Sequence, residues 1–144
     1  MNVLIDTSVR SLAFRRRSQD LNSNENEIVQ ELRELVQEGR VVLIGAVRQE
    51  ILSGIKDKAS YQNLRNRLRE FPDLVPSTSD YEQAAEFGNT CRANGISGSA
   101  IDFLICSIVV RNNLSIFTTD RDFENYGSVV PIRIHDTRLS EKIG

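Results

Sequence analysis

The chain has 144 residues, a length that predicts one domain over residues 1–144 with a substantial buried core. Its 40% hydrophobic and 26% charged residues are ordinary for a globular protein, and its net charge of −2 neither favours nor excludes a nucleic-acid partner. No apolar run approaches the roughly 18 residues of a membrane span, and Asp6 interrupts the apolar start too early for a signal peptide, so we expect a cytoplasmic protein without a membrane partner.

Few residue types in this chain suit nucleophilic or zinc chemistry. Cys91 and Cys106 are too few and too far apart for a zinc site or a disulfide framework, and each is expected to be a small buried hydrophobe. His135 is the single histidine, and no nucleophile-elbow motif accompanies it. Of the 18 basic residues 15 are arginines, whose planar fork suits phosphate, although genomic composition or surface solubility explains this count equally well.

The first half of the chain alternates short apolar runs with helical patterns. A buried strand is expected over Asn2–Ile5, and Asp6, Thr7 and Ser8 begin a helix. There follow a polar, basic loop over Arg15–Asn26, a helix over Glu25–Glu38, a strand over Val41–Ile44, a helix from Ala46 to about Gly54 and a helix over Ser60–Phe71.

The second half continues the alternation. The expected elements are a short connection at Asp73–Val75, a helix over Ser79–Ala93, a turn over Asn94–Gly98, a helix over Ser99–Arg111, a strand over Ser115–Thr118, a last strand over Val129–Ile134 and a polar tail over Asp136–Gly144. Continuous apolar strands separated by helices are typical of a parallel sheet covered on both faces. Ligands of such folds bind outside the carboxyl ends of the strands.

Carboxylates stand at those strand ends. Asp6 follows the first strand, where capping of the next helix would also explain it. Asp120 follows the strand near Thr118, and Asp122 is expected in the first turn of a short helix that Phe123 anchors in the core. Capping explains one of this pair but not both, so we expect Asp120 to face a pocket and Asp122 to cap the turn or lie behind it.

Two further acids lie on helices. Asp102 is the only acid in an otherwise apolar helix, on a face with Ile105 and Cys106. A buried carboxylate costs several kcal/mol, roughly, unless a partner satisfies it, and a structural ion pair is the alternative to a functional role. Glu50 lies beside Val47 and Ile51, where a solvated glutamate at the rim of the helix would give the same pattern.

The acids are more informative together than singly. A doubly wound topology would bring Asp6, Glu50, Asp102 and Asp120 to one edge of the sheet. Clustered carboxylates repel one another and favour hard cations such as Mg²⁺ or Mn²⁺. Such a site activates water and stabilises the oxygens of a phosphodiester during cleavage.

Four segments carry a resemblance to a known family: VLIDTS at Val3–Ser8, EIL at Glu50–Leu52, Asp102 in SAIDFLICSIV, and FTTDRDF at Phe117–Phe123. Their order and spacing span nearly the whole chain. The chain resembles the PIN-domain ribonucleases, in particular the VapC-type toxins of bacterial and archaeal toxin–antitoxin pairs. The residues that follow Asp102 in its helix are larger and more apolar than those of the family pattern, so the packing of side chains around Asp102 is expected to differ.

The resemblance implies a three-layer α/β/α sandwich with a mostly parallel sheet and an Mg²⁺- or Mn²⁺-dependent endoribonuclease acting on RNA, often tRNA or rRNA. It also implies a homodimer and an antitoxin that inserts an arginine or another side chain into the acidic pocket. The implied site has Asp6 and Asp102 as direct metal ligands, Glu50 and Asp120 completing the pocket, and Asp122 and Ser8 as accessory residues. The arginines expected to contact RNA phosphates are Arg10, Arg15–Arg17 and Arg121.

Other readings of the sequence fit less well. A receiver domain would need a second acid beside Asp6 and a lysine at a late strand end, and a haloacid-dehalogenase-type phosphatase would need an acid at Ser8. A PIN-like module that binds protein or RNA without catalysis is the remaining alternative. Such a module would be expected to have lost one of the four acids, and this chain keeps them all.

Overall fold

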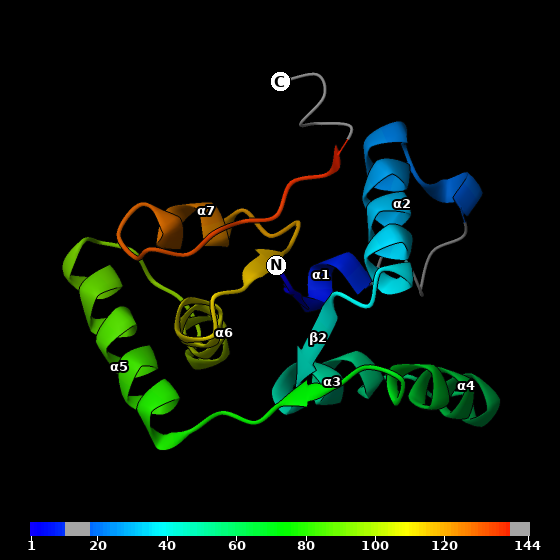
Figure 1. Cartoon of the computed structure of the whole chain (residues 1–144), viewed down its shortest axis with the longest axis horizontal. Coiled ribbons are helices and arrows are strands. Elements are labelled where there is room, and N and C mark those ends of the chain that lie inside the picture. Colours follow the sequence, from blue (N-terminus) through cyan, green and yellow to red (C-terminus); the bar gives the residue numbers. More distant parts are fainter. Residues whose placement is uncertain (11–17, 139–144) are drawn as a thin grey trace.

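The protein is built on a parallel four-stranded sheet, seen in a computed structural model that describes residues 1–10 and 18–138 (Figure 1). The strands follow the order β3-β2-β1-β4 and have these bounds: β1 Val3–Ile5, β2 Val41–Ile44, β3 Asp73–Leu74 and β4 Ser115–Phe117. All residues of β1, β2 and β4 are buried, as their continuous apolar sequences predict.

The register aligns the ends of the two strands that carry acids. Ile5 of β1 lies opposite Phe117 of β4, so the chain leaves both strands at the same level of the sheet. On the other side of β1, Leu4 pairs with Val42, and β2 ends where α3 begins. The segments after β1, β2 and β4 therefore meet at one edge of the sheet, as the sequence predicts.

Helices cover both faces of the sheet and give the predicted α/β/α layers. In Figure 1, α5 and α6 lie side by side on one face, and α2, α3 and α4 lie on the other. The helix bounds are α1 Thr7–Arg10, α2 Ser23–Gln37, α3 Gly45–Leu52, α4 Lys58–Leu68, α5 Thr78–Ala93, α6 Ala100–Arg111 and α7 Asp122–Gly127, with a short 3₁₀ helix, η2, at Ser18–Asp20. No helix in the described ranges is long and apolar enough to cross a membrane.

Helix α6 forms the centre of the core because its sequence is apolar on every side. The residues from Phe103 to Val109 are all buried. Cys106 on α6 and Cys91 on α5 are also fully buried, and burial raises the pKa of both thiols. Both cysteines are thus small core hydrophobes, as predicted.

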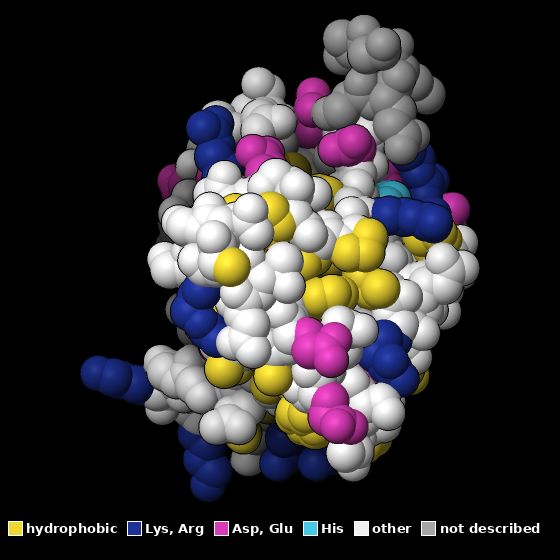
Figure 2. All heavy atoms as spheres, turned by 90° about the vertical axis from the view of Figure 1, so that its left-hand side faces the viewer, with side chains coloured by type: hydrophobic (Ala, Val, Ile, Leu, Met, Phe, Trp, Pro, Cys, Tyr) yellow, Lys and Arg dark blue, Asp and Glu magenta, His cyan; other side chains and the backbone are white. Residues whose placement is uncertain are grey.

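The outer face of the α5–α6 layer is partly apolar. A groove of about 460 Å³ runs between the two helices, and small residues line much of it. Tyr81 is 56% exposed and Ile101 is 40% exposed at this groove. Figure 2 shows the side of the molecule on which α5 lies, where hydrophobic side chains are exposed among charged ones.

Two predictions about the strands are wrong. The segment Val129–Ile134 is not a strand, since only Ile134 forms an isolated parallel bridge, to Ile116 of β4. The N–H groups of Val129 and Val130 bond instead to the carbonyl of Tyr126 at the end of α7, and Pro131 has no N–H. Conversely, the predicted connection after Pro72 contains β3, which pairs with β2 over two residues.

The start of α2 also differs from the predicted loop. Helix α2 begins at Ser23, behind a capping box: the Asn22 side chain accepts from the Glu25 N–H at 2.8 Å, and the Glu25 side chain accepts from the Asn22 N–H at 3.1 Å. The polar tail is ordered at its beginning, where Arg138 pairs with buried Glu31 at 3.3 Å. Residues 139–144 of that predicted tail lie outside the described residues.

Candidate active site

Asp6 is held by two hydroxyl groups, one from α1 and one from the residue that follows β4. The residue is 8% exposed, and its carboxylate accepts hydrogen bonds from Ser8 Oγ at 2.9 Å and from Thr118 Oγ1 at 2.8 Å. Thr118 also accepts the Asp120 N–H at 3.0 Å, and Ser8 accepts the Thr119 N–H at 2.9 Å. This network joins the end of β1 to the loop after β4, so the Asp6 side chain is oriented across the sheet edge.

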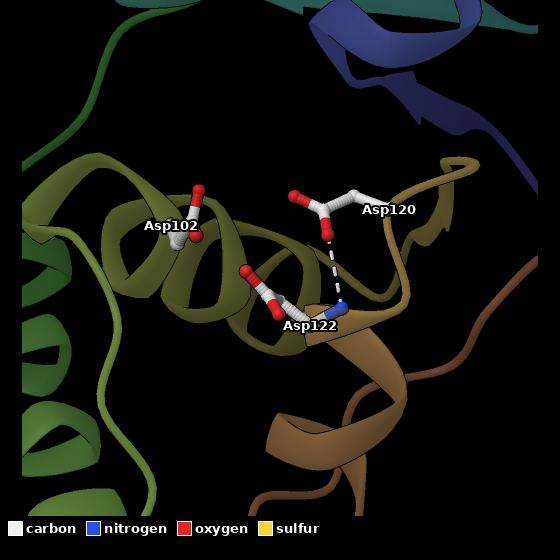
Figure 3. A group of neighbouring side chains, drawn as sticks. All are labelled: Asp102, Asp120 and Asp122. Carbon is white, nitrogen blue, oxygen red and sulfur yellow. Dashed lines mark hydrogen bonds between the residues drawn. The ribbon is translucent and has the colours of Figure 1, made fainter.

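Three carboxylates converge beside this network, as Figure 3 shows. Asp102 comes from the first turn of α6, Asp120 from the loop after β4, and Asp122 from the first turn of α7. One oxygen of each lies within 4.8 Å of the others. In the ranges 1–10 and 18–138, no arginine, lysine or histidine forms an ion pair with any of the three.

The pKa of Asp102 is raised above the usual range of an aspartate. Burial is the largest cause, and the nearby negative charges of Asp6 and Asp120 add to it. Hydrogen bonds oppose this effect: Tyr126 Oη donates to Asp102 Oδ2 at 2.7 Å, and Ser99 also lowers the pKa. Within the described residues Asp102 therefore has hydrogen-bond donors but no cation, which is not the pattern of a structural ion pair.

Tyr126 is a member of the site that the sequence did not predict. Its ring is fully buried, with its centroid 5.2 Å from that of Phe103 and 5.2 Å from that of Phe123. Burial is the main cause that raises the pKa of Tyr126, and the hydrogen bond and charge of Asp102 add to it. The hydroxyl group therefore stays protonated and can donate its hydrogen bond to Asp102. The sequence signal is the F-x-x-Y spacing of α7, which places both rings on one helix face.

Of the two acids of FTTDRDF, Asp122 has another role than the turn cap that the sequence suggested. Asp122 does not cap the turn; its backbone N–H donates to Asp120 Oδ1 at 3.0 Å, so Asp120 supplies the local hydrogen bond. Both carboxylates nevertheless belong to the convergent group. Phe123 is fully buried and anchors α7, as predicted.

Glu50 lies on the surface of α3, outside the group of three acids. It is exposed on α3 and accepts a hydrogen bond from Thr7 Oγ1 at 2.9 Å. Because Thr7 follows Asp6 directly, Glu50 stands next to the network of Asp6 without joining the group of Asp102, Asp120 and Asp122. Of the predicted arginines, Arg121 is exposed between the two site acids, whereas Arg15–Arg17 and the side chain of Arg10 lie outside the described residues.

The donor set fits a hard divalent cation. Carboxylate oxygens are the ligands that Mg²⁺ and Mn²⁺ prefer. Burial is the main cause of the raised pKa of Asp102, and a cation would relieve the repulsion from Asp6 and Asp120 that adds to it. Zinc is disfavoured because neither buried cysteine belongs to this group.

Comparison with protein families agrees with this arrangement. Residues 3–129 match the model of the PIN domain. The chain belongs to the PIN-domain family. This match includes Asp6, Glu50 and all three convergent acids, and PIN domains are generally nucleases. A comparison with curated protein sequences gave no match.

Solved structures share the PIN fold over nearly the whole chain. VapBC2 from Rickettsia felis, bound to a DNA fragment from its promoter, has a TM-score of 0.73 at 16% identity, covering 94% of this chain and 98% of that one. FitAcB from Neisseria gonorrhoeae has a TM-score of 0.71 at 19% identity, covering 93% and 96%. A toxin–antitoxin complex from Klebsiella pneumoniae has a TM-score of 0.66 at 20% identity, covering 92% and 100%.

Proposed function

We propose that this protein is a divalent-metal-dependent endoribonuclease, formed by one PIN domain over residues 1–144, and that it is the toxin of a toxin–antitoxin pair. The observation that carries the proposal is the convergence of Asp102, Asp120 and Asp122 within 4.8 Å in a chain of the PIN-domain family. Three neighbouring carboxylates that form no ion pair within residues 1–10 and 18–138 repel one another, and such a cost to stability is typical of functional sites.

Mg²⁺ or Mn²⁺ is the proposed cofactor. Asp102, Asp120 and Asp122 would hold it, with Asp6 on the side of β1 and Glu50 beyond Thr7. A bound divalent ion supplies a Lewis acid for the phosphate and lowers the pKa of water.

The protein's own residues prepare this chemistry. Ser8 and Thr118 hold the Asp6 carboxylate in one orientation, and Tyr126 favours the ionised form of Asp102. Glu50 is exposed and its Oε2 accepts a hydrogen bond from Thr7, and we propose that its other carboxylate oxygen orients the attacking water. Arg121, exposed between the site acids, would contact the RNA backbone.

We propose that the partner protein is an antitoxin that neutralises the acidic pocket with a basic side chain. The absence of an ion pair at Asp102, Asp120 and Asp122 in the described ranges leaves a charge that suits such an insertion. Two similar structures, that of VapBC2 from Rickettsia felis and that of a toxin–antitoxin complex from Klebsiella pneumoniae, support this partner. A small upstream reading frame with a DNA-binding N-terminus would be the genetic counterpart.

We also propose a homodimer that forms through the α5–α6 face. Ala84, Ala85 and Gly88 line the groove and leave room for the side chains of a second copy, while Tyr81 and Ile101 supply apolar surface. Ile101→Asp should convert a dimer into a monomer in analytical ultracentrifugation. Val75→Asp is the matched control, since Val75 is 86% exposed and does not line the groove; a dimer that survives Ile101→Asp contradicts this interface.

The nuclease assignment is tested by RNA cleavage with Mg²⁺ or Mn²⁺, using tRNA and rRNA as substrates. EDTA, Asp6→Asn, Asp102→Asn and Asp120→Asn should each abolish cleavage, whereas Asp136→Asn, an exposed acid outside the site, should not. Cleavage that persists in EDTA and in Asp102→Asn would show that the metal site is wrongly assigned. Binding of RNA without cleavage under all conditions would favour the catalytically silent module.

A further inference from the structure

A second, smaller cavity adjoins the acidic group on the side of α2. Its volume is about 180 Å³, and it lies between the first turns of α2 and the segment from the end of β4 into α7. Thr118 and Asp120 belong both to its wall and to the site described above. These two shared residues place the cavity next to the acidic group.

The lining of the cavity changes from apolar to polar. Ile28 and Ile134 are half-buried and provide an apolar surface, whereas Asn24, Arg121 and Glu124 are exposed at its rim. The volume is below the range of about 300–1,000 Å³ that holds drug-sized ligands, so it suits one planar ring system. Apolar side chains beneath a ring and polar groups at its edge are the features that recognise an unstacked base of single-stranded RNA.

We propose that this cavity binds one nucleobase next to the scissile phosphate, and that Glu124 makes it prefer bases with an exocyclic amino group over uracil. The proposal rests on the proposed ribonuclease function and adds to it the class of nucleotide recognised. A carboxylate accepts hydrogen bonds only, so Glu124 pairs with the amino groups of adenine, cytosine or guanine and opposes the carbonyl oxygen that uracil presents in the position of the cytosine amino group.

Two other rim residues complete the recognition. Asn24 has a carboxamide that both donates and accepts, and it comes from α2, far from Glu124 in the sequence. Arg121 presents a guanidinium plane on which a base can stack or with which a phosphate can pair. The base is thus met from two elements that the fold brings together beside Asp120.

In the first experiment, an RNA library with a randomised single-stranded loop is cleaved and the products are sequenced, which gives the base preference at each position beside the cut. The wild-type protein should disfavour uracil at one fixed position beside the cut by about tenfold, a discrimination typical of one good base contact. Glu124→Gln, which adds a donor for the uracil carbonyl, should reduce this ratio to about twofold or less. Glu82→Gln, an exposed glutamate on α5 away from the cavity, should leave the ratio unchanged.

The second experiment does not depend on cleavage. Fluorescence anisotropy with the tetramers A₄, C₄ and U₄ should show weaker binding of U₄ to the wild-type protein, and Glu124→Gln should reduce that difference. Equal binding of U₄ and C₄, or a difference that Glu124→Gln leaves intact, overturns the base subsite. If the tetramers are discriminated as expected but the library is not cut, the subsite stands and the nuclease proposal fails.

Discussion

Replacing Gly98 with alanine tests how tightly the loop before α6 packs on Tyr126. A Cβ atom on Gly98 would lie 2.5 Å from the Tyr126 hydroxyl oxygen and 2.8 Å from Phe103 Cζ. Real Cβ atoms essentially never approach this closely, and neither ring can swing into solvent, because Tyr126 is 0% and Phe103 is 4% exposed. The substitution should therefore force the Tyr126 ring away from Asp102.

The expected loss of stability follows from two opposing terms. Overpacking of a buried site costs about 1–3 kcal/mol, whereas replacing a glycine lowers the entropy of the unfolded chain and returns about 0.4–1 kcal/mol. Gly98 does not have a positive φ angle, so backbone strain adds nothing. The net loss is about 1–2 kcal/mol, which lowers the melting temperature of a chain of this length by roughly 2–8 °C.

Thermal and urea unfolding of the metal-free protein measure this loss. Gly45→Ala is the control, since a Cβ at Gly45 has open space and alanine suits its position in α3. Adding Tyr126→Phe to Gly98→Ala removes the atom of closest approach and should recover part of the stability. If Gly98→Ala is as stable as Gly45→Ala, the packing of Gly98 on Tyr126 is not as described.

Three further predictions concern charge. Tyr126→Phe removes a hydrogen bond that lowers the pKa of Asp102, so this pKa should rise further, and calorimetry should show Mn²⁺ binding lost at a higher pH than in the wild type as the pH is lowered. Asp120→Asn keeps an Oδ1 acceptor but removes a repulsive charge; it should raise the metal-free stability by up to about 1 kcal/mol and reduce the Mn²⁺-induced rise in melting temperature. Arg138→Met should cost about 1–2 kcal/mol in urea unfolding, because it removes a partner of Glu31, whose side chain is only 2% exposed; an unchanged midpoint would contradict this.

The layered fold was predictable because its main signals are local. The apolar runs at Val3–Ile5 and Val41–Ile44 and the helical patterns between them lie in consecutive residues. The errors arose where pairing decides the structure. The two residues of β3 are a strand only because β2 lies beside them. Within Val129–Ile134, by contrast, the N–H groups of Val129 and Val130 bond to the carbonyl of Tyr126 and not to a neighbouring strand.

The candidate site was predictable in its acids but not in their contacts. Asp6 and Asp120 follow apolar runs, and Asp102 interrupts one, so each leaves a mark in the sequence. The hydrogen-bond partners Thr118 and Tyr126, which orient these acids, leave no such mark in the sequence. Thr118 bonds to Asp6 across 112 positions, and Tyr126 reaches Asp102 from another helix, and such pairs appear only when the chain is folded. For the same reason the sequence alone could not show that Asp122 shares the group.

The edges of the sheet limit how this protein can assemble with others. At one edge, β3 has only two residues, too few to template a long added strand. At the other, the outer side of β4 is already bonded at Ile116, whose N–H and carbonyl pair with Arg133 and His135, and Pro131 shortly before this bridge further blunts the edge. Strand addition is therefore disfavoured at both ends of the sheet. A partner, whether a second copy or a different chain, is expected to bind the helices, where its side chains rather than its backbone determine which partner fits.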